Sequence, residues 1–205
     1  MRLDRRLVIV VVLGLMVGAA AALFSLPGLR ERLSTASGPI ASVGKAQVGG
    51  PFSLVDPAGR KVTDKDFLGR YMLVYFGFTF CPDVCPTGLQ VMASALDQLG
   101  PKADRIAPLF ITLDLERDTP QQMGEYVKAF HPRILGLTGT SAEIAEVARA
   151  YRVYFKKVTD EKSTAGYTVD HTSIMYVMDT KGEFVAHFTH ATAVDAIVSR
   201  LQKLL

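Results

Sequence analysis

The two cysteines of the chain stand close together in the sequence. Cys81 and Cys85 are separated by three residues, and each is followed by a proline, in the stretch FCPDVCP. A pair at this spacing can form a structural disulfide, carry out thiol–disulfide exchange, or bind a metal through two thiolates. These three interpretations make different demands on the rest of the chain.

The two disulfide interpretations fit the sequence less well than metal binding. A bridge across so few residues closes a very short loop, and loop-closure stabilisation grows with loop length. Redox enzymes of the thioredoxin fold usually carry Cys-x-x-Cys, with two intervening residues. They also usually place a proline before the strand that faces the cysteines, and residues 168–174, TVDHTSI, contain none. Redox work by the two thiols stays open as an alternative.

Metal binding needs a third ligand, and the chain has four histidines. Two thiolates and one imidazole make a soft three-coordinate site that suits copper, particularly Cu(I), whereas structural zinc normally takes four protein ligands. His171 stands where the thioredoxin fold has its proline, in an expected turn before a strand, so we expect it beside the cysteines. His131 is expected at a helix end. His187 and His190 are three residues apart in and after a strand, which turns them to opposite faces.

Alternating strands and helices must position these residues. The aromatic and branched run at 71–80 predicts a buried strand that ends at the cysteines. Apolar residues recur at helical spacing over 87–99, so Cys85 stands where a helix begins and where the helix dipole favours a thiolate. Further strands are expected at 106–114, 134–139, 151–158, 172–179 and 182–188, further helices at 119–130, 141–151 and 195–205, and an exposed excursion at 156–167.

The order of these elements predicts the fold class. Strands that alternate with helices in the middle of the chain imply parallel pairing with helices on both faces, and the last two strands add an antiparallel hairpin. A further hairpin is expected at 52–63, around a Pro-Ala-Gly turn. We therefore expect an α/β fold with a thioredoxin-like central sheet flanked by helices, an added N-terminal β-hairpin and one preceding transmembrane helix.

The N-terminal segment predicts export. Residues 7–26 carry no charge and follow three arginines, and twenty residues at about 1.5 Å each span about the 30 Å of bilayer hydrocarbon. The positive-inside rule places residues 1–6 in the cytoplasm. A tether at 27–46, rich in small residues, then leads to the domain at 47–205. The alternative is a cleaved signal peptide, cut near the small residues at 19–22.

Location and charge limit the expected partners. Because the apolar run begins at residue 7, an organellar transit peptide has no room, and we expect a single-pass protein of a bacterial inner membrane with its C-terminal domain in the periplasm. In that oxidising compartment the cysteines form a disulfide unless something keeps them reduced. The net charge of +3, from 23 basic and 20 acidic residues, predicts no nucleic-acid partner.

Three stretches are similar to a known family. The chain resembles the Sco/SenC family of membrane-anchored copper chaperones over roughly residues 47–204. The resemblance is carried by the stretches FTFCPDVCPTGL, DLERDTP and VDHTSIMYVMD. In that family the two loop cysteines and the histidine of the Asp-His pair bind copper. By position, the resemblance implies Cys81, Cys85 and His171 as ligands of Cu(I), Cu(II) or both.

The resemblance also implies a partner and a process. It implies delivery of copper to the CuA centre of cytochrome c oxidase subunit II during assembly of the oxidase, with a further thiol-reductase role toward the cysteines of that subunit. Another periplasmic copper chaperone or a thioredoxin-like reductant is a further expected partner, and the membrane is contacted through the N-terminal helix. We therefore expect a metallochaperone without catalytic residues. The alternatives are a thiol–disulfide oxidoreductase that uses the two thiols, and a redox or copper sensor.

Three aspartates are candidates for a supporting role around the metal. Asp170 precedes the histidine of the expected site and can orient it. Asp114 ends the strand beside the cysteine strand, where it either neighbours the cysteines or pairs with Arg117. Asp83 lies between the cysteines, either as a solvated loop residue or near the metal.

Overall fold

The computed structural model describes residues 14–16, 47–159 and 165–205. The chain divides into two compact units, residues 1–45 and 46–205. Of the first unit, only the helical residues 14–16 are described. The rest of the transmembrane helix expected at 7–26 and the whole tether at 27–46 lie outside the described residues. Among the residues that are described, no helix has both the length and the apolar character to cross a membrane.

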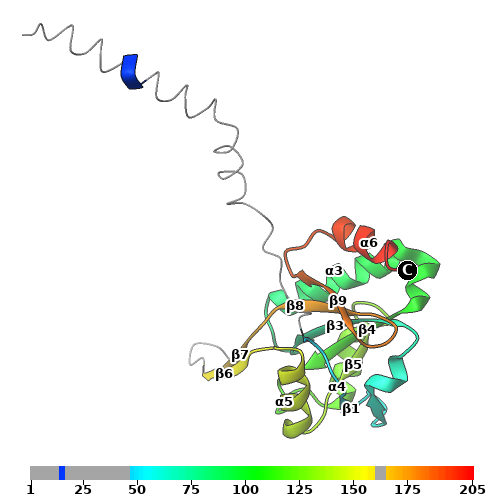
Figure 1. Ribbon diagram of the computed structural model, residues 1–205. Helices are drawn as coiled ribbons and strands as arrows, with labels where there is room; N and C mark the ends of the chain where they lie inside the picture. The colour runs from blue at the N-terminus through cyan, green and yellow to red at the C-terminus, as the bar shows by residue number, and fades with distance from the viewer. Residues whose placement is uncertain (1–13, 17–46, 160–164) are drawn as a thin grey trace, which may run out of the picture. The chain divides into compact units, whose positions relative to one another are not determined.

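A five-stranded mixed sheet forms the centre of the second unit (Figure 1). Its strand order is β5–β4–β3–β8–β9. The strands β3 (Tyr71–Gly77), β4 (Ile106–Thr112) and β5 (Leu135–Leu137) are parallel, and β8 (Ile174–Met178) and β9 (Phe184–Thr189) continue the sheet in antiparallel pairing. Both faces of β3 and β4 are buried, which explains their nearly continuous apolar sequence.

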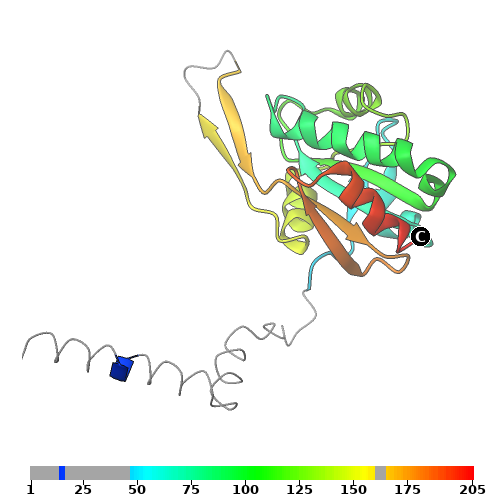
Figure 2. The ribbon, with the colours of Figure 1, turned by 90° about the horizontal axis from the view of Figure 1, so that it is seen from above.

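Helices cover both faces of this sheet. The helices α3 (Val84–Leu99) and α6 (Val194–Gln202) pack together on one face, and α4 (Pro120–Lys128) and α5 (Ser141–Ala150) lie on the other (Figures 1 and 2). Capping boxes begin α4 and α5, because Thr119 and Thr140 each accept a hydrogen bond from a backbone N–H of the first turn. The expected α/β fold with a helix-flanked central sheet is confirmed.

Two hairpins are added to the central sheet. The strands β1 (Ser53–Val55) and β2 (Lys61–Thr63) pair in antiparallel fashion, which confirms the N-terminal hairpin. The strands β6 (Phe155–Thr159) and β7 (Tyr167–His171) form a second antiparallel pair, which projects from the side of the unit in Figure 2. This pair is a separate two-stranded sheet.

The strand β7 corrects the expectation for this part of the chain. The sequence predicts an exposed excursion at 156–167 and a turn at His171, but His171 is the last residue of β7 and pairs with Phe155. The apolar residues Tyr167 and Val169 alternate with polar neighbours, which is the period of a strand. Because charged residues precede this short pattern, the strand was not predicted from the sequence.

Candidate metal centre

The cysteines lie in and just after the loop that joins β3 to α3. Cys81 is in the loop, and Cys85 is the second residue of α3. Both are free thiols, and only 8% of Cys81 and none of Cys85 is exposed. The backbone N–H of Cys85 donates to the Cys81 sulfur at 3.4 Å. The first sulfur therefore faces the free N–H groups of a helix N-terminus, which stabilise a thiolate.

Gly77 makes room for the second cysteine. A Cβ atom on this last residue of β3 would lie 2.6 Å from the Cys85 sulfur and 2.8 Å from the Phe110 ring. Real Cβ atoms do not approach other atoms so closely, so the absence of a side chain lets α3 pack with Cys85 against the end of β3. The sequence pattern around Gly77 does not indicate this requirement.

His171 reaches the cysteines from the end of β7. Its Nε2 atom lies 3.3 Å from the Cys85 sulfur, and its Nδ1 atom lies 3.1 Å from the carbonyl oxygen of Thr172. The contact of Nδ1 with this carbonyl sets the ring so that Nε2 faces the Cys85 sulfur. The ring of Phe78 meets the imidazole edge-on, with centroids 5.8 Å apart. The histidine is thus oriented as a metal ligand requires.

The three side chains converge on one point. The ligand atoms of Cys81, Cys85 and His171 all lie within 4.8 Å of one another. No other group of three potential ligands this close together occurs among the described residues. Two sulfurs and one imidazole nitrogen suit copper better than zinc, because the set is soft and has three members.

The two thiols do not share protons equally. The hydrogen bond that the Cys85 thiol donates to the Cys81 sulfur lowers the pKa of Cys81 to about 4, although burial opposes this shift. The same hydrogen bond, together with burial, raises the pKa of Cys85. The opposite shifts of the two pKa values favour a thiolate at Cys81 and a thiol at Cys85.

Two of the candidate aspartates line the same pocket as the cysteine loop and His171. Asp83 is exposed at the N-cap position of α3, and one of its carboxylate oxygens accepts a hydrogen bond from the Thr87 hydroxyl at 3.5 Å. Asp170 is also exposed and pairs in register with Lys156 across the β6–β7 hairpin. Both residues are exposed, and neither belongs to the group of three close ligand atoms.

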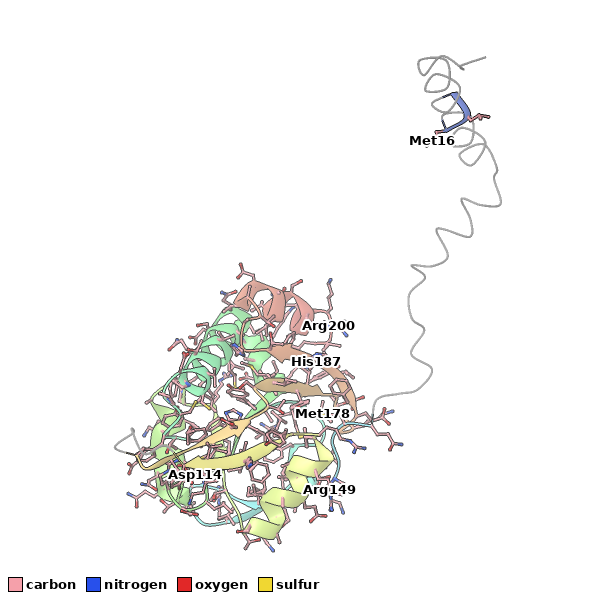
Figure 3. The ribbon with its side chains drawn as sticks, turned by 90° about the vertical axis from the view of Figure 1, so that its left-hand side faces the viewer. Met16, Asp114, Arg149, Met178, His187 and Arg200 are labelled. Atoms are coloured by element: carbon pink, nitrogen blue, oxygen red, sulfur yellow. The ribbon has the colours of Figure 1, made fainter. Side chains whose placement is uncertain are left out.

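The third aspartate, Asp114, is buried and lies beside the β6–β7 hairpin (Figure 3). It forms an ion pair with Arg117, which is one of the two roles expected for it. Its other carboxylate oxygen accepts a hydrogen bond from the Tyr167 hydroxyl at 2.7 Å. Asp114 thus joins the segment after β4 to the first residue of β7.

Asp118 supports the cysteine loop, a role that its place in the sequence does not indicate. One carboxylate oxygen accepts from the Thr79 backbone N–H at 3.0 Å and from the Thr112 hydroxyl at 2.6 Å, and the other accepts from the Thr79 hydroxyl. Only 1% of Asp118 is exposed, and this burial raises its pKa against the effect of the three hydrogen bonds. Because Thr79 stands two residues before Cys81, Asp118 ties the loop to the end of β4.

Comparison with known proteins relates the chain to one family. The SCO1/SenC family model matches residues 41–205. The chain is 43% identical over 175 residues to the mitochondrial Protein SCO1 homolog 1 of Arabidopsis thaliana, a match that covers 85% of the chain and 51% of the relative. It is 35% identical over 185 residues to the SCO2-like protein of Rickettsia prowazekii, with 88% of each chain covered. The chain thus spans about half the length of the plant relative.

Solved structures give the same relationship. The structure of Arabidopsis thaliana ScoI with copper bound is 44% identical, has a TM-score of 0.72, and is matched over 76% of this chain and 96% of that chain. The structure of Bradyrhizobium japonicum ScoI with copper bound is also 44% identical, with a TM-score of 0.71 and coverage of 77% and 99%.

Proposed function

The chain belongs to the SCO1/SenC family, and we propose that it carries copper on Cys81, Cys85 and His171 for the assembly of cytochrome c oxidase. The observation that carries this proposal is the convergence of two sulfurs and one imidazole nitrogen within 4.8 Å. The two similar ScoI structures, which have copper bound, support the choice of metal.

The protonation of the site suits the uptake of Cu(I). Cys81 is already a thiolate, and Cys85 releases its proton when the metal binds, because only thiolates act as ligands. Three ligands leave copper open to attack by a ligand of the receiving protein, which can enter before a donor ligand leaves. Cu(II) prefers an additional oxygen ligand, and the carboxylates of Asp83 and Asp170 line the same pocket.

The wider setting follows from the family and from the N-terminal sequence. We propose that residues 7–26 anchor the protein in a bacterial inner membrane and that the domain at 47–205 works in the periplasm. Its receiving partner is then the CuA domain of oxidase subunit II. A disulfide between the two cysteines would prevent copper binding, so a periplasmic thioredoxin-like reductant must supply the two electrons that keep both cysteines as thiols.

Copper stoichiometry and ligand count test the proposed site. The reduced protein should bind one Cu(I), and X-ray absorption at the copper edge should report two sulfur ligands and one nitrogen ligand. Cys81→Ala and Cys85→Ala should abolish binding, and His171→Ala should weaken it and remove the nitrogen ligand. A His171→Ala variant that holds Cu(I) as tightly as the parent would show that the three-ligand site is wrong.

A thiol–disulfide reductase is the second candidate, and the low pKa of Cys81 favours it. A stable thiolate at neutral pH is a nucleophile toward disulfides, although its reactivity is limited by burial. This function predicts that copper-free protein reduces the CuA-domain disulfide and that His171→Ala leaves the rate unchanged.

A redox or copper sensor, the remaining alternative, would instead capture membrane proteins other than the oxidase in a pull-down.

A further inference from the structure

The hairpin that carries His171 has little support from the central sheet. The strands β6 and β7 pair only with each other among the described strands. His171 nevertheless comes within 3.3 Å of the Cys85 sulfur. Other contacts must therefore hold the hairpin against the rest of the domain at the distance that the metal centre needs.

Arg117 makes several of these contacts at the start of β7. Its Nη1 donates to the carbonyl oxygen of Tyr167 at 3.2 Å, and the centre of its guanidinium lies 3.7 Å from the centroid of the Tyr167 ring. Asp114 holds both partners, through its ion pair with Arg117 and through the hydroxyl of Tyr167. Arg117 and Asp114 thus contact both the backbone and the side chain of Tyr167, the first residue of the strand that ends at His171.

The same guanidinium also contacts the cysteine loop. It lies 4.7 Å from the ring centroid of Phe80, which directly precedes Cys81, and 5.9 Å from that of Phe78. The next residue along the chain, Asp118, bonds Thr79 of the same loop. One side chain therefore touches both segments that supply ligands.

The surroundings of Arg117 favour a fixed position over a mobile one. Its side chain is 14% exposed and that of Asp114 is 3% exposed, so both charges are withdrawn from water. A buried ion pair contributes little net stability but becomes costly when one partner is removed. The nearby Lys157 also contacts the Tyr167 ring, at 3.8 Å, but it is half exposed and pairs with the exposed Glu116, an arrangement that contributes little.

We propose that Arg117 is a positioning residue of the metal centre, one that fixes β7 against the cysteine loop and so sets the distance from His171 to the two sulfurs. This inference rests on the proposed function, in which His171 is the third ligand. Lysine cannot take over the role, because it lacks the planar fork that bonds Asp114 and the Tyr167 carbonyl while lying against aromatic rings.

Competition for Cu(I) with a chromogenic chelator tests the positioning role. Arg117→Ala should weaken Cu(I) binding about 10- to 100-fold, as expected for loss of a group that orients a ligand, and Arg117→Lys should not restore it. Arg149→Ala is the matched control, because Arg149 is exposed on α5 (Figure 3) and should leave the affinity unchanged. An Arg117→Ala variant with parental affinity would overturn the proposal.

A double-mutant cycle shows whether Arg117 acts through the histidine. In a His171→Ala background, Arg117→Ala should cause little further loss, because the ligand that it positions is gone. An equal loss in both backgrounds would overturn the proposal. A His171→Ala variant with parental affinity would instead contradict the three-ligand function itself, so the two failures can be told apart.

Hydrogen exchange gives a readout that does not involve copper. In copper-free Arg117→Ala, the amides of β7 should exchange faster while those of α3 stay protected. Unchanged exchange in β7 would count against the role. If Arg117→Ala does not fold, Tyr167→Leu replaces it in both experiments. Tyr167→Leu removes the aromatic ring that Arg117 contacts and keeps the Asp114–Arg117 ion pair. It should give the same faster exchange in β7 and the same loss of Cu(I) affinity.

Discussion

Cys81 and Cys85 behave as one acid–base pair, and each sets the pKa of the other. The hydrogen bond that the Cys85 thiol donates is the largest cause of the low pKa of Cys81. The helix N-terminus adds backbone N–H groups but does not act alone. The identity of residue 85 therefore controls the ionisation of a sulfur four residues earlier in the sequence.

Removal of that hydrogen bond should raise the pKa of Cys81. In copper-free parent protein Cys81 has a pKa of about 4, so its thiolate fraction is nearly constant above about pH 5. In Cys85→Ala the thiolate should titrate at higher pH, and the rate of alkylation by iodoacetamide should rise between about pH 5 and about pH 9. The pH profile is the measurement, because burial lowers all absolute rates.

Cys85→Ser provides the control for this experiment. The serine hydroxyl can still donate to the Cys81 sulfur, so its profile should lie closer to that of the parent than the profile of Cys85→Ala does. A Cys85→Ala profile that matches the parent would show that the helix N-terminus alone determines the pKa of Cys81.

At the scale of elements, the convergence of the three proposed ligands could be predicted from the sequence better than the contacts that support them. Cys81, Cys85 and His171 could be predicted because thiol and imidazole groups are chemically distinctive and because the strand before the cysteines is continuous and apolar. The contacts that support these residues could not be predicted, because they join residues that lie far apart in the sequence. Asp118 meets Thr79 across 39 residues, and Arg117 meets Tyr167 across 50. The strand β7 was missed for a different reason, because its short alternating pattern follows a run of charged residues.

Loss of the Asp118 carboxylate should loosen the loop between β3 and α3. Asp118→Ala leaves the Thr79 N–H and the hydroxyls of Thr79 and Thr112 without their acceptor in a buried place. We expect a loss of about 1–3 kcal/mol in the free energy of unfolding, measured by urea denaturation of the copper-free protein. Asp118→Asn should lose less, because the amide oxygen still accepts.

Asp104→Ala is the matched control for this prediction. Asp104 pairs with Arg133 at 2.6 Å, but both side chains are largely exposed, so removal of the pair should cost about 0–1 kcal/mol. Equal effects of Asp104→Ala and Asp118→Ala on the unfolding free energy would contradict a specific role for Asp118 in the loop.

At the scale of the whole domain, copper at the proposed site would join parts that lie far apart in the sequence. The proposed ligands come from the loop after β3, from the first turn of α3 and from the end of the hairpin strand β7. The metal would therefore link the projecting hairpin to the central layers. A ligand that binds only the folded chain stabilises it according to its free concentration relative to its dissociation constant.

Cu(I) should accordingly raise the melting temperature of the reduced protein. At a free concentration one hundred times the dissociation constant, the gain is about 2.7 kcal/mol, which corresponds to about 5–10 °C for a domain of this size. Calorimetry without oxygen measures the shift, and His171→Ala should show a smaller shift at the same free Cu(I). The oxidised protein should show none, because a disulfide leaves no thiolate to bind. A shift of equal size in Cys85→Ala would mean that Cu(I) stabilises the fold from some other site.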